Sequence, residues 1–117
     1  MPYVDGFVLA VPTDKIADYK AMAERAGAVW KEYGAIDYVE CIADDVPLGE
    51  LTSFPRAVHK KDDEIVIFSW ITYESREARD AINKKMMEDP RLKCDAENMP
   101  FDGKRMIYGG FTTLVEL

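Results

Sequence analysis

Residues 64–73 read Glu-Ile-Val-Ile-Phe-Ser-Trp-Ile-Thr-Tyr and carry the clearest β-strand pattern in the chain. The stretch is rich in the β-branched and aromatic residues that strands favour. Successive side chains of a strand point to opposite faces, and here both faces are apolar. One face carries Ile65, Ile67 and Ile71, and the other carries Val66, Phe68 and Trp70. Such a strand belongs in a sheet that is covered on both sides.

Three more strands are expected around this one, at residues 3–11, 35–43 and 105–116. The last contains Gly109-Gly110, which predicts a β-bulge or a close approach of another group to the backbone. The order of elements along the chain is then β-α-β-β-α-β. This order predicts a ferredoxin-like α+β fold, with a four-stranded antiparallel sheet and both helices on one face. Residues 1–117 form a single domain of ordinary size.

The first helix is expected after Thr13, a candidate N-cap, and to end at Gly34. Its apolar residues recur at helical spacing over about five turns. The second helix is expected to begin after Ser75 and to stop before Pro90. Its predicted inward-facing residues are Ala78, Ala81, Ile82, Lys85 and Met86.

Two helices cover only one face of the sheet, and the chain shows no spare element for the other face. We therefore predict a homodimer that packs sheet against sheet, since symmetric dimers are the commonest oligomers.

The 117 residues carry 15 basic and 22 acidic side chains, a net charge of -7. Nucleic-acid binders usually present a basic face, so nucleic acid is not expected as a partner. The sequence contains no apolar run long enough to span a bilayer and no signal-peptide pattern, which predicts a cytoplasmic protein without membrane contact. The two cysteines, Cys41 and Cys94, are expected to be free thiols.

Two long connections, residues 44–63 and 90–104, fall on the same rim of the predicted sheet. Long loops are often functional, so this rim is the expected mouth of a ligand pocket. The candidate pocket residues are Arg56, His59, Asp102, Arg105 and Tyr108. The arginines could orient an anionic or carbonyl-bearing ligand, and His59 or Asp102 could transfer protons. Each also has a plainer interpretation, as a surface, turn or packing residue.

Two acids, Asp5 and Glu40, fall within predicted strands. Each could be a tuned catalytic acid, or could simply be paired or exposed at an edge. Asp44-Asp45 is a weak cation signal that solvation of a loop explains equally well. A single histidine excludes a multi-histidine metal or haem site within one subunit, and no phosphate-binding loop, nucleophile elbow or zinc spacing occurs. No metal or cofactor is expected.

Two functions remain open, and the sequence does not decide whether the protein is an enzyme. The first is small-molecule binding or cofactor-free catalysis in a pocket between sheet and helices. The second is a non-catalytic dimeric module for stress response or partner binding. A pocket of ligand size would favour the first.

Several segments are similar to a known family. The clearest is Met-Pro-Phe-Asp-Gly-Lys-Arg-Met-Ile-Tyr-Gly-Gly-Phe at 99–111, supported by Met-Pro-Tyr-Val-Asp-Gly-Phe-Val at 1–8 and Lys-Met-Met-Glu-Asp-Pro-Arg at 85–91. Nearly the whole chain resembles the YbaA-like bacterial family, domain of unknown function 1428. The resemblance implies the dimeric α/β-barrel superfamily, in which ferredoxin-like subunits pack their sheets face to face. It implies no activity and no site residues, because that superfamily includes cofactor-free monooxygenases, haem-degrading enzymes, lyases and members with no known chemistry.

Overall fold

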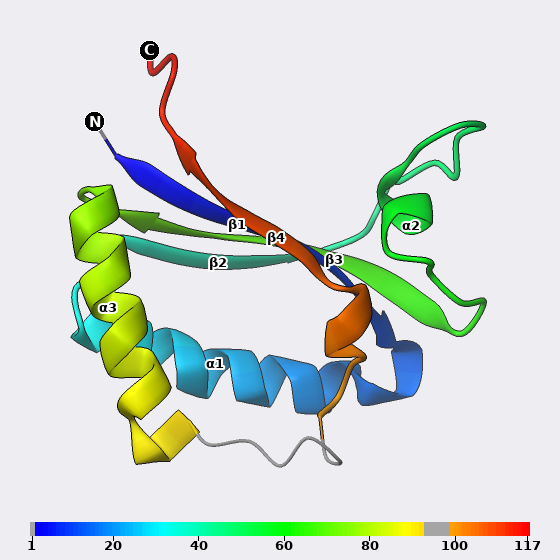
Figure 1. The fold of residues 1–117 in the computed structure, drawn as a ribbon. Helices are drawn as coiled ribbons and strands as arrows, with labels where there is room; N and C mark the ends of the chain where they lie inside the picture. The colour runs from blue at the N-terminus through cyan, green and yellow to red at the C-terminus, as the bar shows by residue number, and fades with distance from the viewer. Residues whose placement is uncertain (1, 93–98) are drawn as a thin grey trace.

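The computed structural model describes residues 2–92 and 99–117. It forms two layers, a twisted sheet and a layer of helices beneath it (Figure 1). The strands are β1 (Tyr3–Pro12), β2 (Asp37–Ile42), β3 (Glu64–Tyr73) and β4 (Ile107–Thr112). All pairings are antiparallel, in the order β2-β3-β1-β4. The predicted ferredoxin-like fold is confirmed, and residues 64–73 lie in the interior of the sheet.

The long helices α1 (Ile16–Glu32) and α3 (Arg76–Glu88) cover the same face of the sheet (Figure 1). Ser75 caps α3 by accepting a hydrogen bond from the Ala78 amide, as predicted. Gly34 ends the α1 region with a φ of 117°, a conformation that glycine adopts most readily. Among the described residues, none of the helices is both long enough and apolar enough to cross a membrane.

Three local predictions about the helices are wrong. Thr13 does not cap α1: it begins a 3₁₀ turn (Thr13–Lys15), and its amide donates to the Asp63 carbonyl at 2.8 Å. Ala81 and Lys85 are exposed, because the buried stripe of α3 runs through Ile82 and Met86. Lys85 instead extends its ammonium over the Tyr33 ring, 5.7 Å from the centroid.

The last strand is shorter than predicted and contains no bulge. It begins only at Ile107, since residues 103–105 form a 3₁₀ turn. It ends where Thr113 bonds the Pro2 carbonyl, just before the start of β1. Gly109 and Gly110 pair in unbroken register with β1. The alternative prediction of a close approach is confirmed, because a Cβ on Gly110 would collide with the Tyr3 hydroxyl and the Arg79 guanidinium.

The sheet face opposite the two long helices is partly covered by the chain itself. The connection after β2 contains a short helix, α2 (Phe54–Ala57), which lies above this face (Figure 1). Val58 follows it and is fully buried against Val8, Ala10 and Val66. The expectation that no element covers the second face is therefore wrong at this end of the sheet. Elsewhere on the face, Phe68, Ile107 and Phe111 remain exposed, at 42%, 45% and 64%.

Candidate functional site

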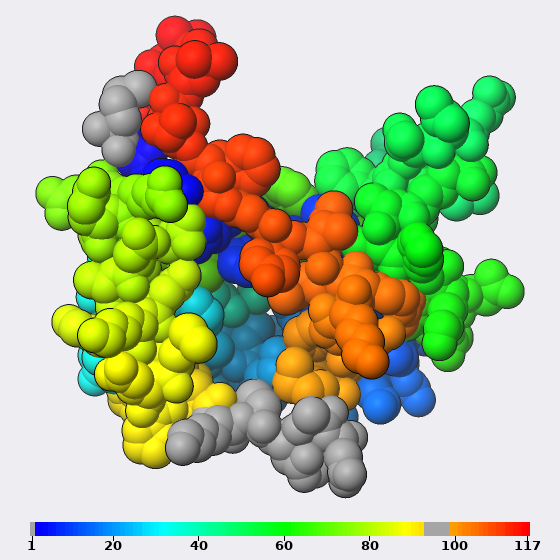
Figure 2. Space-filling model, viewed as in Figure 1, coloured from blue at the N-terminus to red at the C-terminus, as the bar shows by residue number. Residues whose placement is uncertain are grey.

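A cavity of about 590 Å³ lies between the sheet and the two long helices. Its lining comes from β1, α1, α3 and β4, together with residues just after α3 and in the segment that leads into β4. Figure 2 shows the hollow between the yellow-green surface of α3 and the orange surface of the segment that leads into β4. The predicted pocket between sheet and helices is thus present, although its walls differ from the expected rim.

Most of the cavity wall is apolar and deformable. Five methionines line it, together with Phe7, Trp30, Leu92 and Tyr108; the methionines are Met22, Met86, Met87, Met99 and Met106. Methionine side chains are unbranched and polarisable, and they adapt to ligands of different shape. The cavity is therefore suited to a mainly apolar molecule.

Asp5 is the acid of this cavity. It projects from β1 and is only 7% exposed. Burial raises the pKa of its carboxyl, while a hydrogen bond from the Tyr73 hydroxyl and the nearby charge of Arg79 oppose that rise. The Tyr73 hydroxyl in turn accepts a hydrogen bond from Trp30 Nε1 at 3.1 Å. Asp5 is thus held in place by a chain of hydrogen bonds and still keeps a proton more readily than an exposed acid.

Arg79 forms the basic side of the site. Its Nη2 donates to the Tyr3 hydroxyl at 2.9 Å, and its guanidinium lies 5.0 Å from the centre of the Tyr3 ring. Its Nε is 3.6 Å from Asp5 Oδ1, an ionic contact. Arg79 and Asn83 both line the cavity from α3. The site therefore combines an acid, a fixed cation and a side-chain amide inside a mainly apolar wall, which Arg25 and Arg91 also line.

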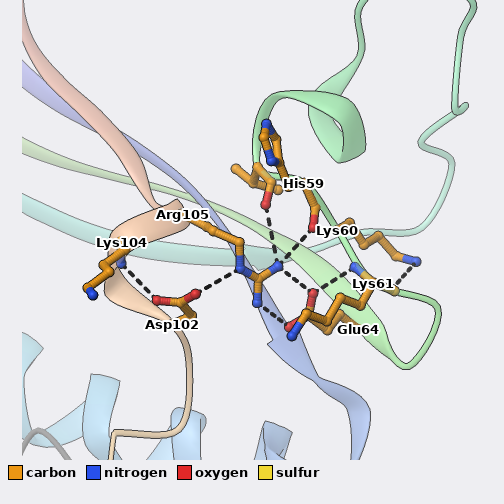
Figure 3. Close-up of polar contacts among 8 residues, drawn as sticks. His59, Lys60, Lys61, Glu64, Asp102, Lys104 and Arg105 are labelled. Carbon is orange, nitrogen blue, oxygen red and sulfur yellow. Dashed lines mark hydrogen bonds and ion pairs between the residues drawn. The ribbon is translucent and has the colours of Figure 1, made fainter.

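Three of the five predicted site residues meet at a different place, around Arg105 (Figure 3). The Arg105 guanidinium bonds Asp102 Oδ2 at 3.0 Å and the His59 carbonyl at 2.9 Å. It also forms two hydrogen bonds to Glu64, which sequence reasoning did not select. The hydrogen bonds from Arg105, helped by its charge, lower the pKa of Glu64 to about 2. Other protein groups accept hydrogen bonds from most of the Arg105 N–H groups. This arginine therefore connects segments of the chain.

The other two predicted site residues lie apart from this cluster. Arg56 donates to the carbonyls of Leu48 and Gly49, which holds its own loop. Tyr108 is 72% exposed, stacks on Phe7 with 6.4 Å between ring centroids, and lines the cavity of Asp5. Of the predicted set, only Tyr108 belongs to that cavity.

Glu40 lines a second cavity, of about 610 Å³, between α1 and β2. Its two carboxylate oxygens accept hydrogen bonds from the hydroxyls of Tyr19 and Tyr38, at 2.7 and 2.8 Å. Burial, together with the hydrogen bonds to Glu40 and its negative charge, raises the pKa of both tyrosines. Glu40 is thus paired, as one of its two interpretations expected.

Sequence reasoning missed Arg79, Asn83 and Tyr73. A signal existed for the first two, because residues 79 and 83 share the helical stripe of Ile82 and Met86. Polar residues on a buried stripe are candidates for a site. Tyr73 gave no such signal, since an aromatic residue at the end of a strand is ordinary.

No group of three or more metal-ligating side chains occurs among residues 2–92 and 99–117. Cys41 is exposed and free. Cys94, the other predicted free thiol, lies outside the described residues, as does part of the predicted 90–104 loop.

The chain matches a family model described as "Protein of unknown function (DUF1428)" over residues 2–103. It is 57% identical over 116 residues to "Uncharacterized protein YbaA" of Escherichia coli strain K12, and the match covers 99% of both chains.

Two solved structures have the same fold at low sequence identity. One is a dimeric ferredoxin-like protein from an uncultured marine organism, with a TM-score of 0.64, 10% identity and coverage of 98% of this chain and 97% of that one. The other is SnoaB, a cofactor-independent oxygenase from Streptomyces nogalater, with a TM-score of 0.55, 12% identity and coverage of 99% and 96%. At these identities the similarity establishes the fold alone.

Proposed function

We propose that this chain, which belongs to the DUF1428 family of unknown function, binds a small, mainly apolar molecule in the cavity beside Asp5. Asp5 accepts a proton from an acidic group of that molecule, and Arg79 stabilises the resulting anion of the molecule. The chemistry requires a carboxyl group and a cation, which the chain itself supplies. The protein then acts as a cofactor-free enzyme or as a binding protein for such a molecule.

The observation that carries this proposal is the burial of Asp5 at the cavity wall. An acid that burial has shifted toward its neutral form reduces the stability of the folded chain at neutral pH. Groups with such shifts gather where proteins bind or transform ligands. A raised pKa also brings the carboxyl closer to the pH at which it exchanges protons efficiently.

Size and fold agree with this proposal. The cavity volume of about 590 Å³ lies within the usual range for small-molecule sites, roughly 300–1,000 Å³. SnoaB, which has the same fold, is a cofactor-independent oxygenase. This is an analogy of fold, and it supports the idea that a sheet-and-helix cavity can serve chemistry without a bound cofactor.

We also propose that two copies pair through the open sheet face. Phe68, Ile107 and Phe111 are exposed there, and Trp70 is half-buried beside Phe68, with 5.8 Å between the two ring centroids. Two fold neighbours are described as dimeric ferredoxin-like proteins, which supports the same arrangement. The cytoplasmic location and the absence of a nucleic-acid partner stay predictions from the sequence.

Methionine methyl NMR tests the cavity directly. Five methionines line the cavity, and their methyl groups report on a molecule bound there. We expect small aromatic weak acids such as phenols to shift these five methyl signals. The Asp5→Asn variant should still bind neutral aromatic compounds while losing its preference for the acidic ones. A cavity that binds none of these compounds would contradict the proposal and favour the partner-binding module.

A further inference from the structure

Glu40 is a half-buried carboxylate that forms no ion pair with the described residues. Its two oxygen atoms accept hydrogen bonds from the hydroxyls of Tyr19 and Tyr38. Charges that are taken out of water are usually paired with an opposite charge. Glu40 also lines the cavity of about 610 Å³ between α1 and β2, so a molecule bound there is within reach of the carboxylate.

The two tyrosines leave this cluster with acceptors alone. Burial and the contacts with Glu40 raise the pKa of both tyrosines, so each hydroxyl keeps the proton that it donates to the carboxylate. An ionised carboxylate has about four acceptor positions. The tyrosine hydroxyls take two of them. The cluster therefore offers a bound molecule negative charge and acceptor lone pairs, and no hydroxyl proton.

The rest of the cavity wall is mainly apolar. One stripe of α1 supplies the helical side, with small side chains along its middle that leave space between the helix and β2. The apolar aliphatic residues and the glycine of the wall are Ile16, Ala23, Gly27, Ala28, Ile42 and Ile67. A ligand in this cavity thus contacts one acidic cluster and an extended apolar surface.

Two lysines line the same cavity, and both are bonded to other groups. Lys20 Nζ lies 2.9 Å from Glu24 Oε1, and both of these side chains are exposed. Lys31 Nζ donates a hydrogen bond to the Ile36 carbonyl. Neither ammonium group forms an ion pair with Glu40, so the place of a cation beside this carboxylate is left to a ligand.

We propose that this second cavity binds a primary amine that carries an apolar body. The ammonium group lies beside Glu40, and the apolar body lies along the stripe of α1. An ammonium group has three N–H donors and no acceptor, which matches a cluster that offers acceptors alone. The net charge of -7 also attracts cations rather than anions. Among the described residues, none lines both this cavity and the cavity beside Asp5, so the two sites are separate.

Three probes with the same phenethyl body test the charge and the N–H donors in turn. 2-Phenylethylamine has both. 2-Phenylethanol has a neutral hydroxyl in place of the ammonium group. Trimethyl(2-phenylethyl)ammonium keeps the charge and has no N–H donor. Hydrogen bonds between charged groups are stronger than neutral ones, so we expect the amine to bind at least about tenfold more tightly than the alcohol. The trimethyl probe should also bind less tightly than the amine.

Isoleucine methyl NMR of the full chain measures these affinities. Ile16, Ile42 and Ile67 line the cavity, and their methyl signals should shift as the amine is added. Ile107 lies on the opposite face of the sheet and should stay unchanged. The methionine methyl signals report on the cavity beside Asp5 in the same titration, and they should not shift either.

Glu40→Gln is the decisive variant, because it removes the charge and keeps nearly the same shape. It should bind the amine and the alcohol with similar affinity. Glu24→Gln is the matched control, since Glu24 lines the same cavity but is exposed and paired with Lys20. This control should keep the preference for the amine. Thermal unfolding shows whether both variants are folded, and the comparison of probes on the wild type decides the question if Glu40→Gln is not.

Equal affinity of the wild type for the amine and the alcohol would overturn the proposal. A preference that survives Glu40→Gln, or one that Glu24→Gln removes, would overturn it as well, because another group would then bind the ammonium. Trimethyl(2-phenylethyl)ammonium that binds as tightly as the amine would contradict the role of the N–H donors. An amine that shifts the methionine signals and not those of Ile16, Ile42 and Ile67 would place the amine site beside Asp5 instead.

Discussion

Arg105 holds Glu64 through two parallel hydrogen bonds, of 2.8 Å from Nη1 and 2.6 Å from Nη2. The pair joins the first residue of β3 to the turn that precedes β4, two segments 41 residues apart. Both side chains are largely buried, at 17% and 4% exposure. Bidentate arginine–carboxylate pairs are among the strongest side-chain hydrogen bonds, so this contact fixes the rim where the long connections meet.

Replacing Arg105 by methionine should destabilise the fold without affecting ligand binding. The change removes the cation from the buried Glu64 and leaves the Lys61 amide as its hydrogen-bond donor. Removing one partner of a buried ion pair costs roughly 3–5 kcal/mol of unfolding free energy. Urea denaturation measures this loss. Arg56→Met is the matched control, because Arg56 bonds only loop carbonyls in the described part of the chain and its loss should cost much less. A large loss of probe affinity in folded Arg105→Met would instead return Arg105 to the binding site, as first predicted from the sequence.

The Arg105–Glu64 pair should also make the stability of the fold depend on pH. The folded-state pKa of Glu64 is lowered from 4.5 to about 2, chiefly by its hydrogen bonds from Arg105. A lowered pKa stabilises the fold above the unfolded value, and this stability is lost as pH falls from about 4.5 toward 2. Glu64→Gln should therefore unfold with a shallower pH dependence across that range. Equal slopes for the variant and the wild type would show that the pair does not stabilise the fold.

Asp5 should make the stability of the fold depend on pH in the opposite direction. Its pKa is raised above 3.8 by burial, so the unfolded chain releases this proton more easily than the folded one. Its contribution is most favourable below pH 3.8 and is lost as pH rises through the folded-state pKa. Asp5→Asn should thus unfold at a higher temperature than the wild type near neutral pH, with the difference shrinking in acid. A variant that is less stable at every pH would mean that the contacts of Asp5 with Arg79 and Tyr73 outweigh its burial.

These contrasts show which features the sequence could predict. Strong periodicity in the sequence predicts that the strands and helices exist, and the strand predicted at residues 64–73 coincides with β3 at both ends. The candidate site depended on loops, and the sequence could not tell that Arg105 would meet Glu64, because that pair depends on how β3 and β4 are brought together in three dimensions. Asp5 was recognised as an unusual acid, but its partner Arg79 was hidden in a helix stripe that looks mainly structural.

Gly27 offers a test of how closely α1 approaches the sheet. A Cβ at this position would lie 2.6 Å from Cδ1 of the Tyr38 ring. Gly27→Ala should therefore destabilise the fold by about 1–3 kcal/mol through overpacking, reduced by up to about 1 kcal/mol because alanine favours helix. Gly103→Ala is the matched control, since a Cβ there meets nothing within 4 Å. Thermal denaturation measures the cost of both substitutions, and equal stability of the two variants would contradict the overpacking against Tyr38.

The open sheet face predicts a homodimer that a single charge should disrupt. The Phe111 ring lies over Gly6 and Gly109 and is 64% exposed. In a sheet-to-sheet dimer this ring would be buried, and a lysine in its place would put an unpaired charge in the interface. We expect Phe111→Lys to sediment as a monomer at concentrations where the wild type is a dimer.

Met87→Lys is the control for this variant. Met87 is 84% exposed on α3, in the helical layer on the other side of the sheet, so its substitution should leave the dimer intact. If only Phe111→Lys dissociates, the sheet face is the interface. If Met87→Lys dissociates instead, the copies associate through their helices, and the exposed aromatic residues of the sheet need another partner. A wild-type monomer at micromolar concentration would contradict the dimer itself.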